Sequence, residues 1–265
     1  VRERLAELLE QWRDHANIHA PTGSSRHAEA AQLYWLLLQA AVSHPLVLGE
    51  LIAARRFGRP PRGELLPQSP IDLRLLEVPP LFPHEQEVLD DLLSVEGGVA
   101  LPRLVPLVEA VRSGQERGLK TVLFCDAPGV ADRLATALAL RVEGDVLRHV
   151  VGDHLDAFLE SDGMATVLVC DRRAEEGLNL QTVRAQAVHL DLPLDPSRFE
   201  QRMGRIDRFG ARAPATSVIF ADQDPLAEAW RRCLVDVVRV FERSVASLQY
   251  VLEDHIGKLR ETAFA

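Results

Sequence analysis

The sequence predicts an α/β fold, in which a mostly parallel β-sheet carries helices on both faces. Three observations lead to this prediction. Short apolar runs alternate with helical patterns between residues 120 and 220, which is the order that a parallel sheet with crossover helices produces. Apolar residues recur at helical spacing in residues 1–57, and again from about residue 225. The sheet is therefore expected between an N-terminal helical region and a C-terminal helical extension.

The charge balance restricts the possible functions. The chain has 265 residues, a net charge of −9 and 47% hydrophobic residues, enough for a sizeable core. An acidic balance argues against a simple basic nucleic-acid binder, although it leaves room for a local basic patch. Only two of the 30 basic residues are lysines. Because arginine is so common here, an arginine cluster is informative only through its spacing and its neighbours.

The cysteines and the apolar stretches bear on location. Three cysteines are present without C-x-x-C spacing, which is typical of a reduced cytoplasmic protein rather than a disulfide scaffold. The charged N-terminus shows no signal peptide, and the missing initiator methionine is consistent with a piece of a longer chain. The longest apolar stretch, Leu33–Val42, is too short to span a bilayer. We therefore expect a cytoplasmic protein that makes no membrane contact.

The N-terminal region is expected to be helical apart from one proline-rich connection. Apolar residues at positions 5, 8, 9 and 12 predict a first helix, and similar patterns predict helices over 26–43, 46–56 and 84–94. Seven of the 16 prolines fall within 58–83, which predicts an irregular connection. His15 and His19 have a spacing that could hold a metal on a helix, but no third ligand accompanies them, so we expect no metal.

The strands of the sheet are predicted from short apolar runs that follow a helix at 102–117. These runs are Thr121–Cys125, Asp145–Val150, Thr166–Cys170, Ala187–Leu192 and Ser217–Phe220. Helical patterns connect them, and a helical tail is expected from Pro225 to Glu261. The resulting domain boundaries are 1–94 for the helical region, 95–222 for the α/β lobe and 223–265 for the extension. Ligands of such sheets gather at the carboxyl ends of the strands.

An arginine-rich segment, EQRMGRIDRFG at residues 200–210, follows the fourth strand. Asp195 is a suitable N-cap, Pro196 suits the first helical position and Gly210 lies past the expected end of the helix. Its three arginines lie three residues apart, on one broad stripe of that helix. One interpretation is a solvated face with ion pairs to Glu200 and Asp207. The other is an anion site, which is favoured because a second polar run, Asp171–Gln181, follows the preceding strand and reaches the same edge.

These two runs carry a resemblance to a known family. The stretch CDRRAEEGLNLQ at 170–181 and the stretch VHLDLPLDPSRFEQRMGRIDRFG at 188–210 resemble motifs V and VI of superfamily-two helicases. The likeness is greatest to Swi/Snf-type ATPases, in particular to the bacterial branch that includes the RNA-polymerase-associated ATPase. KTVLFCD at 120–126 resembles the motif IV strand of the same lobe. The chain is thus similar to the C-terminal RecA-like lobe of such an ATPase.

The resemblance implies a division of labour between two RecA-like lobes. The first lobe holds ATP and Mg²⁺, and the second supplies arginine fingers and nucleic-acid contacts. Arg205 and Arg208 would be the catalytic fingers. The residues implied to bind the nucleotide or to couple it to DNA are Gln201, Arg202, Glu176 and Gly177. The residues implied to contact nucleic acid are Asn179, Gln181 and Arg172, with interlobe contacts as the alternative for Asn179 and Gln181.

The sequence also departs from the family pattern. Asp171 stands where many relatives have Ser or Thr, and an acid there would repel phosphate. The chain lacks a G-x-x-x-x-G-K-[ST] loop and a convincing magnesium-binding Asp-Glu pair. We therefore expect half of an ATP-driven double-stranded DNA translocase, inactive without its first lobe. The alternative is a non-catalytic module that binds a partner ATPase or RNA polymerase, and a defence-system partner also remains open.

Overall fold

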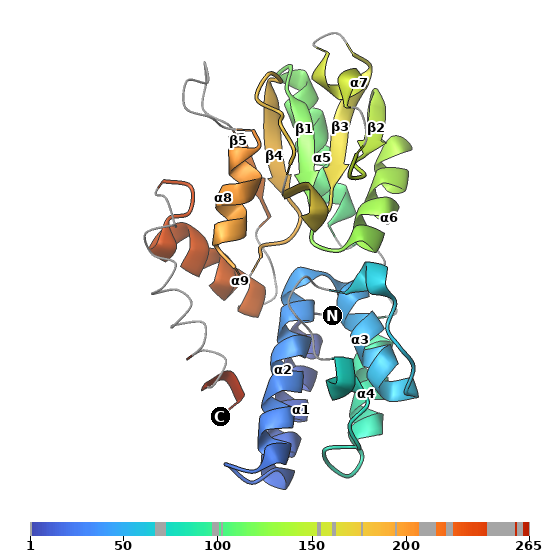
Figure 1. The fold of residues 1–265 in the computed structure, drawn as a ribbon, viewed down its shortest axis with the longest axis vertical. Helices are drawn as coiled ribbons and strands as arrows, with labels where there is room; N and C mark the ends of the chain where they lie inside the picture. Colours follow the sequence, from blue (N-terminus) through green and yellow to red (C-terminus); the bar gives the residue numbers. More distant parts are fainter. Residues whose placement is uncertain are drawn as a thin grey trace. The chain divides into compact units, whose positions relative to one another are not determined.

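The computed structural model describes residues 2–66, 73–96, 101, 103–152, 155–160, 163–175, 177–193, 195–206, 216–220, 225–242, 258 and 262–264. Contacts divide the chain into two compact units, a helical unit formed by 1–100 with 222–265 and a sheet unit formed by 101–221 (Figure 1). Among the described helices, none is both long enough and apolar enough to cross a membrane.

The helical unit is built around four helices, close to the positions that the sequence predicted. Trp12 is fully buried and stacks on Tyr34 with the ring planes 4° apart. Apolar residues at the spacing of one helix face therefore form the core of this unit. The four helices are α1 (Arg2–His19), α2 (Ser25–Ser43), α3 (Pro45–Phe57) and α4 (Glu85–Glu96).

Two buried carboxylates attach the proline-rich connection to these helices. Glu85 accepts hydrogen bonds from Arg55 Nη2 at 2.8 Å and from Leu81 N at 2.8 Å. Glu50 is bound by Arg59 and Arg62; burial works to raise its pKa, but these hydrogen bonds outweigh burial and hold the pKa at about 2. In its described residues, 58–66 and 73–83, the connection is irregular, as predicted, apart from the 3₁₀ turns η1 (Gly63–Leu65) and η2 (Leu73–Leu76).

The predicted C-terminal helix is interrupted. The chain forms α9 (Pro225–Arg232) and continues into a π-helical segment, η4 (Cys233–Val238). Arg239 then adopts a left-handed backbone conformation with φ 58°, which ends the helix. The prediction of one uninterrupted helix from Pro225 to Glu261 is therefore wrong at residues 239–242. Most of the later part of that helix lies outside the described residues.

Among the residues that the structure describes, the sheet unit contains five parallel strands, which confirms the predicted fold class. The strand order is β2-β3-β1-β4-β5, so β1 occupies the centre (Figure 1). Phe124 of β1 is level with Cys170 of β3 and with His189 of β4, so these three strands end together. The strands are β1 (Lys120–Phe124), β2 (Asp145–Arg148), β3 (Ala165–Cys170), β4 (Ala185–His189) and β5 (Thr216–Ile219).

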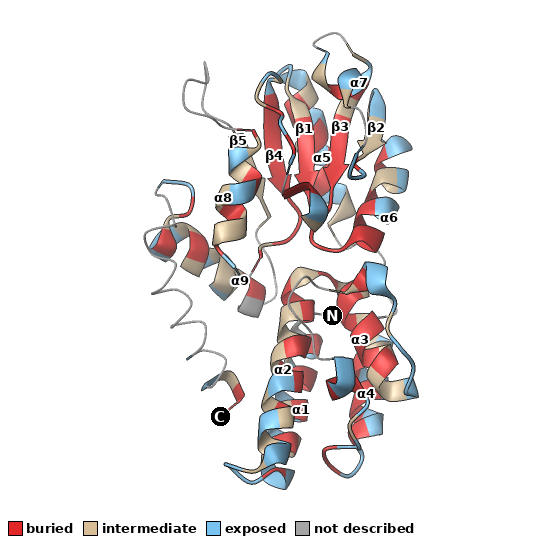
Figure 2. Ribbon diagram, viewed as in Figure 1, coloured by how far each residue is buried: buried red, intermediate tan, exposed pale blue. Residues whose placement is uncertain are grey.

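Helices cover both faces of this sheet. Helices α5 (Leu104–Glu116) and α6 (Pro128–Ala139) lie on one face. The other face is covered by α7 (Asp156–Leu159), the 3₁₀ turn η3 (Arg172–Glu175) and α8 (Ser197–Gly204). The three central strands are buried almost throughout (Figure 2). Their apolar runs are continuous because both faces are covered.

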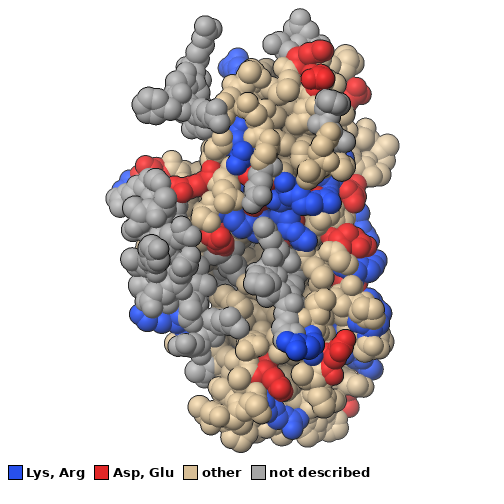
Figure 3. Space-filling view, in the orientation of Figure 1, with Lys and Arg blue, Asp and Glu red and all other residues tan. Residues whose placement is uncertain are grey.

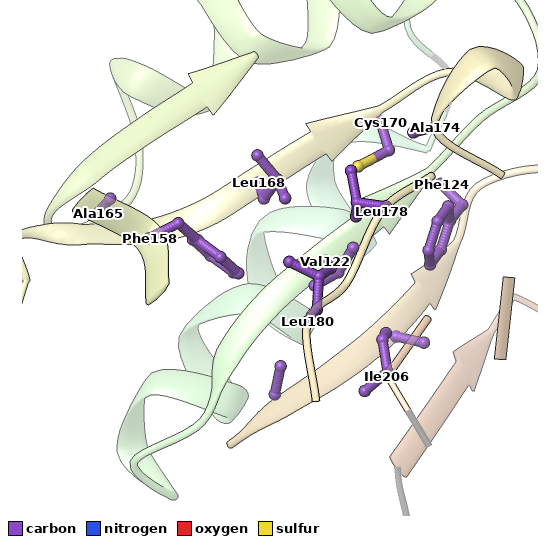
Figure 4. Packing of buried hydrophobic residues seen from close by; sticks show 12 residues of the cluster. Val122, Phe124, Phe158, Ala165, Leu168, Cys170, Ala174, Leu178, Leu180 and Ile206 are labelled. Atoms are coloured by element: carbon purple, nitrogen blue, oxygen red, sulfur yellow. The ribbon is translucent and has the colours of Figure 1, made fainter. Parts of the chain in front are cut away.

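One hydrophobic cluster fixes the loop that follows β3. Leu178 and Leu180 lie on the face of the sheet that carries Val122 of β1, and Ile206 lies at the same face (Figure 4). All four side chains are at least 94% buried, with Ile206 the most exposed at 6%. The loop and the residues after α8 are therefore packed on the sheet by apolar contacts rather than held by polar contacts alone.

A steric prediction follows from the turn before β2. Gly144 has φ +76°, and a Cβ atom there would lie 2.7 Å from the Met164 carbonyl oxygen. Gly118 has φ +66° with nothing within 4 Å of such an atom. We expect Gly118→Ala to cost about 1–2 kcal/mol from backbone strain alone and Gly144→Ala about 1–3 kcal/mol more from the clash. Denaturant unfolding of the two variants measures the loss of unfolding free energy in each. Equal losses would contradict the position of the Met164 carbonyl oxygen beside Gly144.

Candidate functional site

Three carboxylates lie at the carboxyl ends of neighbouring strands. Asp126 follows β1, Asp171 follows β3 and Asp191 follows β4. They are only 6%, 1% and 2% exposed, respectively. A buried carboxylate is costly unless it is paired. Each of them is in fact bound by arginine side chains, and Figure 3 shows basic side chains gathered over this edge of the sheet.

Helix α8 brings two arginines to these carboxylates. Its N-cap residue is Pro196 and not Asp195 as predicted, although Asp195 Oδ1 still accepts a hydrogen bond from Ser197 N at 2.9 Å. Arg198 and Arg202 lie four residues apart and therefore share one face of the helix. Phe199 is also buried and packs against His189 of β4 with ring centroids 4.8 Å apart. The helix is thus held by one aromatic and two charged side chains.

Arg202 is completely buried. Its Nε donates to Glu175 at 2.8 Å, its Nη2 donates to Asp191 at 3.1 Å, and its Nη1 donates to the Asp191 backbone oxygen at 3.0 Å. The side chain is 0% exposed. Its guanidinium group therefore has no exposed surface with which to meet a ligand in this structure. The solvated-face interpretation expected ion pairs to Glu200 and Asp207; Arg202 instead binds Glu175 and Asp191, and Asp207 lies outside the described residues.

Arg198 binds two carboxylates that follow different strands. It donates to Glu175 through Nε and Nη2, both at 2.7 Å, and to Asp126 through Nη2 at 2.8 Å. Burial works to lower the pKa of Arg198, but the Glu175 hydrogen bond and the charges of both carboxylates raise it above its usual range. Glu175 therefore accepts hydrogen bonds from both arginines of α8, and Arg198 binds Asp126 as well.

Asp171 is held between two other arginines. Arg148 at the end of β2 and Arg173 of η3 both donate to its carboxylate, with 3.0 Å between Arg173 Nε and Asp171 Oδ1. Burial works to raise the pKa of Asp171, but these hydrogen bonds outweigh burial and hold the pKa at about 2. The negative charge of Asp171 is thus offset by two guanidinium groups, although Arg148 is shared with Asp132.

Arg205 is arranged differently from Arg202. Helix α8 ends at Gly204, so the helix predicted to continue to Gly210 is shorter than expected. The Arg205 carbonyl oxygen instead accepts a hydrogen bond from Leu180 N at 3.1 Å. The Nη1 atom of Arg205 donates to the Leu178 backbone oxygen at 3.3 Å. In the part of the chain that the structure describes, Arg205 Nε is buried and has no hydrogen-bond partner. The predicted arginine stripe is therefore divided, with Arg202 inside the protein and Arg205 beside the loop.

The remaining predicted site residues lie around that loop or outside the described residues. Gln201 and Asn179 are exposed, and Gln181 and Arg172 are half-buried. Gly177 is exposed and has φ +81°, a conformation that favours glycine. Arg208 and Glu176 lie outside the described residues. Arg202 donates to Glu175, so the two motif stretches are joined by a hydrogen bond in this structure.

The sequence reasoning missed the carboxylate partners and Arg198. The available signal was an acidic residue directly after two of the apolar runs, at positions 126 and 171, and another near the end of the run Ala187–Leu192, at position 191. Buried ion pairs of this kind need acids and arginines at the same strand edge. Arg198, four residues before Arg202, was the remaining cue.

A pH dependence follows from His189, which is buried beneath this network. Burial, reinforced by the nearby charge of Arg202, lowers the pKa of His189 well below its usual value. An unfolded chain takes up a proton on this residue near pH 6.5 whereas the folded chain does not, so the stability of the fold decreases as pH falls below that value. The decline has a limit of about 1.4 kcal/mol per pH unit. Unfolding free energies at pH 7.0 and 5.5 should differ less in His189→Phe than in wild type; equal differences would contradict the neutral state of His189.

Comparison with known proteins relates part of this chain to helicases. Residues 105–210 match the model of the helicase conserved C-terminal domain. The chain is 32% identical over 122 residues to DEAD-box ATP-dependent RNA helicase 46 of Arabidopsis thaliana, a match that covers 44% of this chain and 18% of that protein. It is 44% identical over 55 residues to the RNA polymerase-associated protein RapA of Vibrio campbellii, covering 21% of this chain and 6% of RapA. The chain thus spans less than a fifth of the length of these curated relatives.

Solved structures give the same fold. The C-terminal part of the Fun30 ATPase domain aligns with a TM-score of 0.53 and 14% identity, over 96% of this chain and 91% of that one. The Hef helicase domain of Pyrococcus furiosus aligns with a TM-score of 0.51 and 17% identity, over 87% of this chain and 55% of that one. The family match, the motif residues and the parallel sheet agree, and the chain is therefore identified as one that carries a helicase C-terminal lobe.

Proposed function

We propose that this chain is the second motor lobe of an ATP-dependent double-stranded DNA translocase. In this proposal the chain acts only together with a first RecA-like lobe of the same protein, and we call the protein that joins both lobes the two-lobe protein. Bound ATP would supply the phosphoanhydride bond whose hydrolysis drives movement. The role of the present chain is to direct cationic side chains at the phosphates and to contact the DNA backbone.

The observation that supports this proposal most is that the Arg205 guanidinium group makes few hydrogen bonds. Its Nη1 makes one 3.3 Å hydrogen bond to a backbone oxygen, and its Nε is a buried donor without a partner among the described residues. A buried donor that is left unsatisfied costs about 1–3 kcal/mol, so this position favours an anionic ligand. A planar guanidinium group can bind two phosphoryl oxygens at once, which fits the arginine-finger role. Arg208 is proposed as the second finger.

The carboxylates of this edge do not fit Mg²⁺. Asp126, Glu175 and Asp191 all accept hydrogen bonds from arginine side chains. These guanidinium nitrogens lie 2.7–3.1 Å from the carboxylate oxygens and so occupy the oxygens that a divalent cation would need. We therefore assign the metal to the first lobe, and Gln201, Gly177 and Glu176 of this chain to the neighbourhood of the nucleotide.

Contacts with the DNA backbone are proposed for the loop after β3. Asn179 is exposed and Arg172 and Gln181 are half-buried, and all three side chains can donate hydrogen bonds to phosphate oxygens. The objection that Asp171 would repel phosphate is weakened because Arg148 and Arg173 bind it. Binding through such contacts should weaken as salt increases.

The purified chain alone is expected to hydrolyse no measurable ATP, because it lacks the phosphate-binding loop. The two-lobe protein should hydrolyse ATP, and double-stranded DNA should stimulate it. Turnover by the isolated chain that Arg205→Ala abolishes would contradict the division between lobes. A folded two-lobe protein without turnover would instead support the alternative of a non-catalytic module that binds a partner ATPase or RNA polymerase.

A further inference from the structure

One buried carboxylate, that of Glu175, binds both arginines of α8. Glu175 accepts hydrogen bonds from Arg198 at 2.7 Å and from Arg202 at 2.8 Å. We infer that Glu175 and Arg198 are positioning residues for Arg205, an inference that rests on the proposed arginine-finger function. Neither residue was expected from the motifs, and neither is proposed to touch the nucleotide.

Helix α8 cannot set its own orientation. It has only eight residues and no side-chain cap hydrogen bond from its N-cap residue, Pro196. Isolated helices of that length are marginal in water, so its geometry depends on tertiary contacts. Two guanidinium groups four residues apart would also repel each other. The Glu175 carboxylate lies between Arg198 and Arg202, removes that repulsion and fixes one face of the helix.

The loop after β3 also forms hydrogen bonds with Arg205, just beyond the C-terminal end of α8. Leu180 N donates to the Arg205 oxygen at 3.1 Å, and Arg205 Nη1 donates to the Leu178 oxygen at 3.3 Å. The loop between Glu175 and Leu180 therefore meets α8 at its arginine face and meets Arg205 just beyond its end. Because the loop binds both the arginine face of α8 and Arg205, a rotation of α8 would change the direction of the Arg205 side chain. A misplacement of about 1 Å at a reacting centre can cost about 10²-fold in rate.

Arg198 is the member of this network that can be altered without removing the core of the site. Its side chain is 12% exposed, whereas the Arg202 side chain is 0% exposed. Loss of Arg198 leaves Glu175 still paired with Arg202 but removes the arginine that binds Asp126. A lysine at 198 would keep the charge but could not bind two carboxylates in one plane as a guanidinium does. The two substitutions therefore separate charge from geometry.

The test measures ATP hydrolysis by the two-lobe protein with Arg198→Ala, Arg198→Lys, Glu175→Gln and Arg205→Ala. Arg133→Ala, on the exposed side of α6, serves as the matched control. We expect kcat to fall about 10- to 100-fold in the Arg198 and Glu175 variants, with KM for ATP changed less than about twofold. Lysine at 198 should restore thermal stability but not kcat, which a merely structural role would not produce.

The outcomes distinguish this inference from the proposed function. If Arg205→Ala abolishes turnover while folded Arg198→Ala and Arg198→Lys keep wild-type kcat, the positioning role is overturned and the finger role stands. If Arg205→Ala itself keeps wild-type turnover, the proposed function fails and the positioning role fails with it. If Arg198→Ala does not fold, Arg198→Lys and Glu175→Gln decide the matter, because full kcat in both overturns the inference.

Discussion

Replacement of Arg205 by alanine is expected to lower kcat for ATP hydrolysis by the two-lobe protein about 10³-fold or more, because arginine fingers contribute about 10³–10⁵ in rate. Arg205 is half-buried at the end of α8 and bonds a backbone oxygen rather than a carboxylate. Its charge is therefore available to phosphate at small cost. The measurement is steady-state ATP turnover in the presence of saturating DNA.

Lysine at position 205 is the informative companion variant. It retains the positive charge but loses the planar pair of donors, so it should recover only a small part of the lost rate. Arg133→Ala is the control for a surface arginine of the same unit. Turnover of Arg205→Ala within about threefold of wild type, in a protein that still binds ATP and DNA, would be incompatible with a finger role.

Replacement of Arg202 by methionine is expected to lower the free energy of unfolding by about 3–5 kcal/mol, the usual cost of removing one partner of a buried ion pair. Arg202 is fully buried and makes three hydrogen bonds to Glu175 and Asp191. Methionine fills similar space but leaves Asp191 without its charged partner. Denaturant unfolding of the purified chain gives the value directly.

A second substitution separates lost charge from lost packing. Adding Asp191→Asn to Arg202→Met removes the unpaired charge while an amide oxygen can still accept from Asp126 N, which Asp191 binds at 2.6 Å. The double variant should regain part of the lost stability. Arg133→Met, on an exposed position, should change stability by less than about 0.5 kcal/mol. A loss of that small size in Arg202→Met would show that the buried network contributes little.

The strands could be predicted from the sequence because they are buried on both faces. Runs such as Thr121–Cys125 and Thr166–Cys170 are continuously apolar, and only a covered parallel strand keeps that pattern. The predicted and observed ends of these runs differ by one residue, since β1 begins at Lys120 and β3 at Ala165. The fold class followed from their alternation with helices. The family resemblance came from the spacing of motif residues rather than from the fold.

The interior of the site could not be predicted in the same way. Arg202 and Arg205 look alike in a local pattern of arginines three residues apart, yet one is buried and the other lies beside the loop. The difference comes from tertiary contacts, because Glu175 and Asp191 reach Arg202 from two other strand ends. The early end of α8 likewise depends on the hydrogen bond between Leu180 N and the Arg205 oxygen. Local propensity contains neither contact.

The most direct test of the central claim is a structure of the two-lobe protein with ADP and aluminium fluoride, a mimic of the transferred phosphoryl group. We predict that the Arg205 guanidinium lies about 3 Å from the fluoride ligands, with Arg198 and Arg202 still bound to Glu175. If Arg205 remains on the Leu178 oxygen while another cation contacts the fluoride, the assignment of this lobe as the source of the arginine finger is contradicted.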